Sequence, residues 1–101
     1  MSFEIEDIGI GFLTDEQLED LASSLENKVY SFIQQHKYWQ LLADFSIIID
    51  LNQDNNKVLT LVLDSEISGG LTTQQLEEFQ SEIFKYSQST LKEELKCMKS
   101  S

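Results

Sequence analysis

A chain of 101 residues with 41% hydrophobic and 10% aromatic residues has enough apolar surface for one small globular domain, which argues against disorder. Eighteen acidic residues against seven lysines and no arginine give a net charge of −11, which argues against direct nucleic-acid binding or docking on an anionic membrane and favours a basic partner. A single cysteine, an acidic N-terminus and the lack of a long apolar run predict a cytoplasmic protein without internal disulfide, secretory signal or membrane span.

The N-terminal residues 3–12 favour a short strand. Their even positions hold Glu4, Glu6, Ile8, Ile10 and Phe12. Glycines at positions 9 and 11 would weaken a strand in the interior of a sheet, so this strand is expected at a sheet edge.

A helix is predicted from Thr14 to about residue 38. Thr14 can cap it with Gln17 at the third helical position, and Leu13 can pack on Leu18, which together make a capping box and a hydrophobic staple. The apolar stripe that follows consists of Leu18, Leu21, Ala22, Leu25, Val29, Phe32, Ile33 and His36. At about 100° per residue these positions stay within an arc of about 120°, which is typical of a helix that faces a core.

Residues 45–63 change to a period of two and predict an antiparallel hairpin. One face carries the apolar positions Phe45, Ile47, Ile49, Leu51, Leu59, Leu61 and Leu63. The polar loop NQDNN joins the two strands. The second face also carries apolar residues, among them Ile48 and Val62, so we expect it to be partly covered, for example by another chain.

The stretch LTTQQL at residues 71–76 repeats the signals of the first helix start. Leu71 is the staple, Thr72 the cap and Gln75 the third helical residue, and the helix then runs through Met98. We therefore predict a single α+β domain, residues 1–101, in the order (β)-α-β-β-α. Its antiparallel sheet consists of a central hairpin and a short N-terminal strand, with two helices packed on one face.

Two glycines, Gly69 and Gly70, precede the last helix, where phosphate-binding loops place theirs. No basic residue lies between positions 58 and 84, and the spacing and lysine of a P-loop are missing. The pair is therefore expected to turn the chain between strand and helix. The alternative is a small anion- or ligand-binding protein, or a minor enzyme, that uses this turn.

No residue pattern identifies a reaction. Asp50, Asn52, Asp54 and Asn56 alternate as at the start of a calcium loop, but the glycine and the final glutamate of such a loop are missing. The only histidine, His36, and the only cysteine, Cys97, have no metal-ligand or nucleophile–base partner at a recognisable spacing. We assign no catalytic, cofactor-binding or metal residue, and expect a non-enzymatic protein without a cofactor or small-molecule ligand.

The last helix carries two apolar stripes. The first, with Leu76, Phe79, Ile83, Tyr86 and Thr90, can face the sheet. The second consists of Phe84, Leu91, Leu95 and Met98 and widens the apolar arc to about 180°. We predict that this second stripe and the edge of the hairpin bind a protein partner in a homo- or heterodimer. The alternatives are that the stripe packs on the first helix or that the C-terminal turns fray.

The element order, with SGGLTTQQLEEF leading into a final helix, resembles a small archaeal family of unknown function. More distantly, it resembles the small dimerising subunit of the KEOPS tRNA-modifying complex. That resemblance implies an antiparallel sheet that extends on dimerisation and helices that bundle against a catalytic subunit with an ATPase fold. Because the chain has no arginine to help hold tRNA, it would resemble a non-catalytic paralogue, which pairs with or caps its partner.

Overall fold

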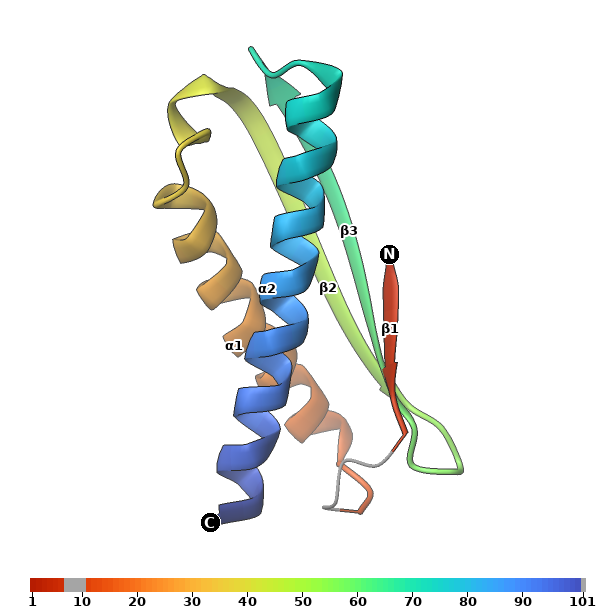
Figure 1. The fold of residues 1–101 in the computed structure, drawn as a ribbon. Helices are drawn as coiled ribbons and strands as arrows, with labels where there is room; N and C mark the ends of the chain where they lie inside the picture. The colour runs from red at the N-terminus through yellow and green to blue at the C-terminus, as the bar shows by residue number, and fades with distance from the viewer. Residues whose placement is uncertain (7–10, 101) are drawn as a thin grey trace.

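The computed structural model describes residues 1–6 and 11–100 and confirms the α+β class and the order β-α-β-β-α. The elements are strand β1 (Ser2–Ile5), helix α1 (Asp15–Gln34), a 3-10 turn η1 (Trp39–Leu41), strand β2 (Leu42–Gln53), strand β3 (Leu59–Gly69) and helix α2 (Thr73–Ser100). Figure 1 shows the sheet behind α2, with β1 at one side and α1 at the other.

The sheet is antiparallel with the strand order β1-β3-β2. Strands β2 and β3 form the predicted hairpin, in which Ile49 lies opposite Leu63. The short strand β1 pairs with the first part of β3 and lies at a sheet edge, as expected. Its core-facing residues are Phe3 and Ile5 rather than Glu4 of the predicted even positions. The strand ends at Ile5, and the predicted positions Ile8 and Ile10 lie outside the described residues.

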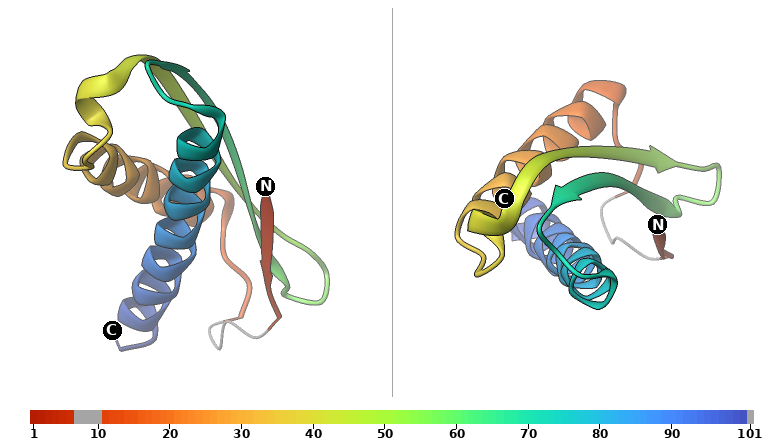
Figure 2. Two further views of the ribbon diagram at one scale, coloured as in Figure 1. Left: turned by 45° about the horizontal axis from the view of Figure 1, so that its top comes forward. Right: turned by 90° about the horizontal axis from the view of Figure 1, so that it is seen from above.

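Both helices pack on the same face of the sheet and cross one another there (Figure 2). The core between them consists mainly of aliphatic side chains from α1, α2 and the odd positions of β2 and β3. Its buried members from these elements are Leu21, Leu25, Val29, Ile33, Ile47, Ile49, Leu51, Leu59, Leu61, Leu63, Phe79, Ile83, Leu91 and Leu95. The predicted inner face of the hairpin and the stripe of α1 are therefore confirmed.

The two helix starts have the same geometry, as their sequences predicted. The Thr14 Oγ1 accepts the Gln17 backbone N–H at 3.1 Å, and the Gln17 Oε1 accepts the Thr14 N–H at 2.9 Å. The corresponding distances between Thr72 and Gln75 are 3.1 and 3.0 Å. Each box satisfies two backbone donors that the first helical turn leaves without partners.

Helix α1 ends at Gln34, earlier than the predicted end near residue 38. After it, Tyr38 turns into the core, where its side chain is 9% exposed, and its backbone N–H donates to the Nδ1 atom of His36 at 3.1 Å. The free energy gained by burying the Tyr38 ring offsets the hydrogen bonds that a further helical turn would have made. The apolar period did not reveal this end, because His36 still lies in phase with the stripe.

Candidate interaction surface

The glycine pair before α2 has a structural role. Gly69 has a φ angle of +152°, and a Cβ atom built there would collide with the carbonyl oxygen of Leu41. The next N–H, that of Gly70, donates to the same oxygen at 2.8 Å. Because this donor already has a backbone acceptor, the turn offers fewer N–H groups to an anion than a phosphate loop does. The geometry supports the turn interpretation.

The polar loop after β2 forms a turn held by Asp54. One oxygen of its carboxylate accepts the backbone N–H groups of Asn56 at 2.8 Å and Val58 at 2.9 Å. Lys57 adopts a positive φ of 67° in the same turn. In the described residues, no group of three or more histidine, cysteine or acidic side chains is placed to hold a metal ion. The loop therefore follows the usual chemistry of asparagine- and aspartate-rich turns.

His36 and Glu82 join the end of α1 to α2. The Nε2 of His36 lies 2.5 Å from a carboxylate oxygen of Glu82, and its Nδ1 accepts the N–H of Tyr38. A nitrogen that accepts an N–H carries no proton, so the proton of the neutral imidazole lies on Nε2 and is donated to Glu82. The ring also packs on Phe79, with 4.5 Å between ring centroids. With both nitrogens engaged, the pair stabilises the helix contact and offers no free base.

Three further polar contacts connect α2 to α1 and to the segment that follows α1. A hydrogen bond from Lys28 to Glu94 lowers the pKa of the Glu94 carboxyl, against the effect of its burial, and raises the pKa of the Lys28 amine. Ser24 donates to the same carboxylate at 2.9 Å. Near the other end, burial and a hydrogen bond to Glu78 raise the pKa of the Tyr38 phenol. These contacts align α2 on α1.

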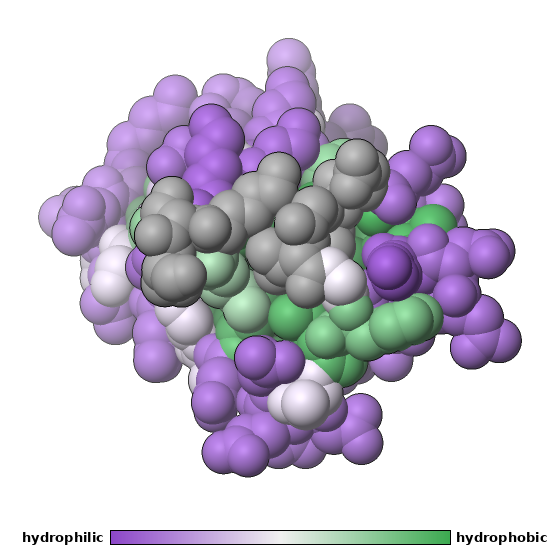
Figure 3. Space-filling model, turned by 90° about the horizontal axis from the view of Figure 1, so that it is seen from below, coloured by the Kyte–Doolittle hydropathy of each residue, from purple (hydrophilic) through white to green (hydrophobic). Residues whose placement is uncertain are grey.

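One end of the molecule, where α1 begins and α2 ends, is apolar at its centre and hydrophilic around it (Figure 3). Leu13, Leu18 and Met98 are half-buried side chains of these segments that pack against the core. Phe12 is 62% exposed. The C-terminal end of α2 therefore contributes Met98 to an apolar part of the surface.

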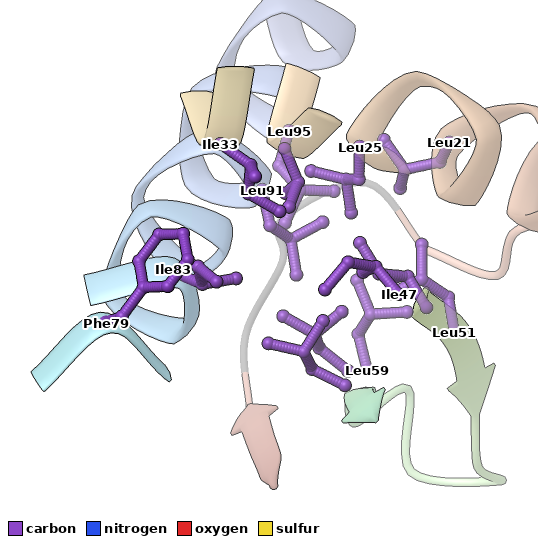
Figure 4. Close-up of a cluster of buried hydrophobic side chains, with 14 of the residues drawn as sticks. Leu21, Leu25, Ile33, Ile47, Leu51, Leu59, Phe79, Ile83, Leu91 and Leu95 are labelled. Carbon is purple, nitrogen blue, oxygen red and sulfur yellow. The ribbon is translucent and has the colours of Figure 1, made fainter. Parts of the chain in front are cut away.

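The second stripe of α2 is nevertheless largely internal. Leu91 and Leu95 are 0% and 5% exposed and point toward side chains of α1 in the core (Figure 4). The prediction that these two residues are exposed to a partner is wrong for the folded chain, because α1 covers them where the two helices cross. Phe84 and Met98 are half-buried and remain partly accessible. For Leu91 and Leu95 the alternative holds, in which the stripe packs on the first helix.

The outer face of the sheet is the most distinctive exposed surface. Midway along β2, Ile48 is 53% exposed and lies opposite Asp64 of β3. The half-buried Val62 of β3, which lies opposite Asp50, is its diagonal neighbour on this face. Around them are the exposed carboxylates of Glu4, Asp44, Asp50, Asp64 and Glu66. The three strands carry no lysine, and none of these carboxylates forms an ion pair with a cation in the described part of the chain. The face is thus an apolar centre within unpaired negative charge.

A smaller aromatic group lies where β2 begins. The rings of Tyr30 and Trp39, each 36% exposed, contact the ring of Phe45 with centroid distances of 5.3 and 5.5 Å. Leu41, in the same stretch of chain as Trp39, is 44% exposed. The sequence did not single out this group, because its members come from a helix, a turn and a strand. Since the rings contact each other, they have less area to offer a partner.

No protein-family model, curated protein or solved structure matches the chain. Within residues 1–6 and 11–100, no helix has both the length and the apolar character needed to cross a membrane.

Proposed function

We propose that this protein is a non-catalytic interaction module, a small subunit of a cytoplasmic multiprotein complex that binds its partner through the outer face of its sheet. The observation that carries the proposal is Ile48, a large apolar side chain that remains 53% exposed within a sheet face of unpaired carboxylates. A solvated antiparallel sheet face normally alternates polar residues with the buried ones. Ile48 departs from that pattern.

The physical gain from covering this face comes from two sources. Complete burial of an isoleucine side chain contributes about 1.5–3 kcal/mol, so covering the exposed half of Ile48 contributes roughly 1 kcal/mol. The surrounding carboxylates select for a basic partner and increase the rate at which it associates. Together they favour a partner that places an apolar side chain between basic ones.

The resemblance to the small KEOPS subunit gives the proposal a more specific form. In that form the chain is a dimerising, non-catalytic paralogue that pairs with or caps another subunit of a tRNA-modification assembly. The lack of arginine leaves the tRNA contacts to other subunits. The half-buried Phe84 and Met98 of α2 would supply additional protein contacts.

The test compares Ile48→Glu with Leu41→Glu, which places the same charge on another exposed aliphatic residue. Each purified variant is used in affinity capture from native extract and in reconstitution with a KEOPS-type catalytic subunit. Light scattering measures the mass of each complex. We expect the wild type and Leu41→Glu to bind the same partner and Ile48→Glu to lose at least about tenfold in affinity, because it buries an unpaired carboxylate.

Equal binding by Ile48→Glu and the wild type would exclude the outer face as the contact surface. A chain that remains monomeric and captures no partner would refute the interaction module as a whole. Circular dichroism of both variants controls for folding.

A further inference from the structure

A stretch of β3 has a partner strand on one side only. Strand β1 pairs with residues 59–62, and just beyond it Met1 and Leu63 exchange two backbone hydrogen bonds of 2.8 and 2.9 Å. Strand β3 continues from there to Gly69, paired with β2 alone. Figure 1 shows β1 beside one part of β3 only.

The alternation of an antiparallel ladder determines which groups face this gap. Residues in such a ladder direct their N–H and C=O groups to one side and to the other in turn. The N–H and C=O groups of Leu63 point toward β1. The backbone groups of the next odd residues, Ser65 and Ile67, therefore point to the same side of β3, where β1 no longer lies. In the described part of the chain no partner accepts or donates to these backbone groups. An unpaired edge of this kind is a template for another strand.

The opposite edge of the sheet is less open. On β2, the backbone N–H of Ile49 donates to the Glu26 carboxylate of α1 at 3.3 Å. Near the end of the same strand, the Gln53 side chain accepts the Leu13 N–H at 2.7 Å and donates to the Gly11 carbonyl at 2.9 Å. Helix α1 thus engages one backbone group of the β2 edge, and the preceding loop is bonded to a side chain near the end of that strand. Among the described residues no contact of either kind is made at Ser65–Ile67.

The side chains around the open edge indicate which residues a strand added there would need. On the core side, Ile67 and the Phe84 of α2 are half-buried members of the apolar layer. On the outer side, Asp64 and Glu66 are exposed and have no ion-pair partner among the described residues. An added strand would therefore place apolar residues inward and basic residues outward. A second copy would bring acidic strands with no lysine, so it is the wrong complement.

We infer that the edge of β3 at Ser65–Ile67 binds an extended basic segment of a partner protein by adding a strand to the sheet. Alternating lysine or arginine and aliphatic residues would pair with the open backbone groups and with the carboxylates of Asp64 and Glu66. This inference rests on the proposed interaction function and identifies the partner's binding segment.

The experiment titrates the 15N-labelled full chain with a blocked five-residue peptide of alternating lysine and valine. We expect amide shifts and slower hydrogen exchange at Ser65 and Ile67, and weaker binding as salt rises. Glu66→Gln should weaken binding about 2–5-fold, because it removes one cross-strand charge pair. The matched variant Asp20→Asn removes an exposed carboxylate of helix α1, outside the sheet face, and should leave binding unchanged.

Backbone pairing is tested separately from charge. Ser65→Pro removes a donor that points away from β2 and should abolish the exchange protection. A peptide with methylated backbone nitrogens should fail in the same way against the unaltered protein, which makes the test independent of the folding of the proline variant. Unchanged binding of the methylated peptide, or equal binding of a glutamate–valine peptide, would overturn the inference.

A peptide that does not bind, together with partner loss in Ile48→Glu, would refute strand addition and leave the proposed function intact.

Discussion

Replacing Gly69 with alanine tests the geometry that joins the sheet to α2. The new Cβ atom would lie inside the contact distance of the Leu41 carbonyl oxygen, 2.8 Å from the Ala43 nitrogen and 2.9 Å from the Leu42 Cα. All three are backbone atoms, so no side-chain rotation can relieve the collision. The φ of +152° is also unfavourable for a residue with a Cβ. The start of β2 and the end of β3 would have to separate.

Two terms set the expected cost. A residue held in a region of backbone space that belongs to glycine costs about 1–3 kcal/mol. Overpacking against a rigid neighbour costs about 1–3 kcal/mol more. Because the backbone can shift to relieve both together, we expect Gly69→Ala to lower the free energy of unfolding by roughly 2–4 kcal/mol. For a domain of this size that corresponds to a melting temperature lower by about 10–30 °C.

The assay is urea unfolding followed by circular dichroism, with Gly70→Ala as the matched control. A Cβ at Gly70 would have only the Leu41 oxygen nearby, at 3.8 Å, which is an ordinary contact. Its replacement should therefore change the free energy of unfolding by no more than about 1 kcal/mol. Similar stability of the two variants, or a larger loss in Gly70→Ala, would show that the close approach of residues 41–43 does not constrain this turn.

Three other predictions concern the helices. Leu91→Ala should cost about 2–5 kcal/mol in urea unfolding, because it leaves a cavity in the core, and a stability like that of the wild type would contradict its burial. Thr72→Ala should lower the free energy of unfolding by about 1 kcal/mol through loss of its cap, whereas Thr72→Ser should retain most of it. Glu94→Gln should alter the pH dependence of the melting temperature. The folded-state pKa of Glu94 is depressed below its ordinary value of 4.5. Its contribution is therefore present above pH 4.5 and is lost as pH falls through the folded-state pKa, so the difference from the wild type should disappear in acid.

Local signals were sufficient where hydrogen-bonding chemistry is local. The capping boxes at Thr14 and Thr72 form between residues three apart, so their side chains specify the helix start wherever the helix lies. The hairpin faces followed in the same way from the period of two, which placed Ile49 and Leu63 on the buried side.

Local signals failed where distant segments compete. The sequence did not show that β3 continues through Asp64, Ser65 and Glu66, because three consecutive polar residues show no alternation of apolar and polar positions. Pairing with β2 extends that strand, since the ladder provides backbone hydrogen bonds whatever the side chains are. The end of α1 was likewise decided by the burial of Tyr38.

The sequence by itself therefore determined the α+β class, the element order, the helix starts and the acidic character of the surface, because each depends on neighbouring residues or on composition. Only the tertiary structure decided which apolar residues are exposed. Leu91 and Leu95 become core through the crossing of α2 with α1, and Ile48 remains in solvent because both helices pack on the opposite face. An apolar stripe in the sequence does not show whether it is buried in its own domain or against a partner, because burial of apolar surface is favourable in either place.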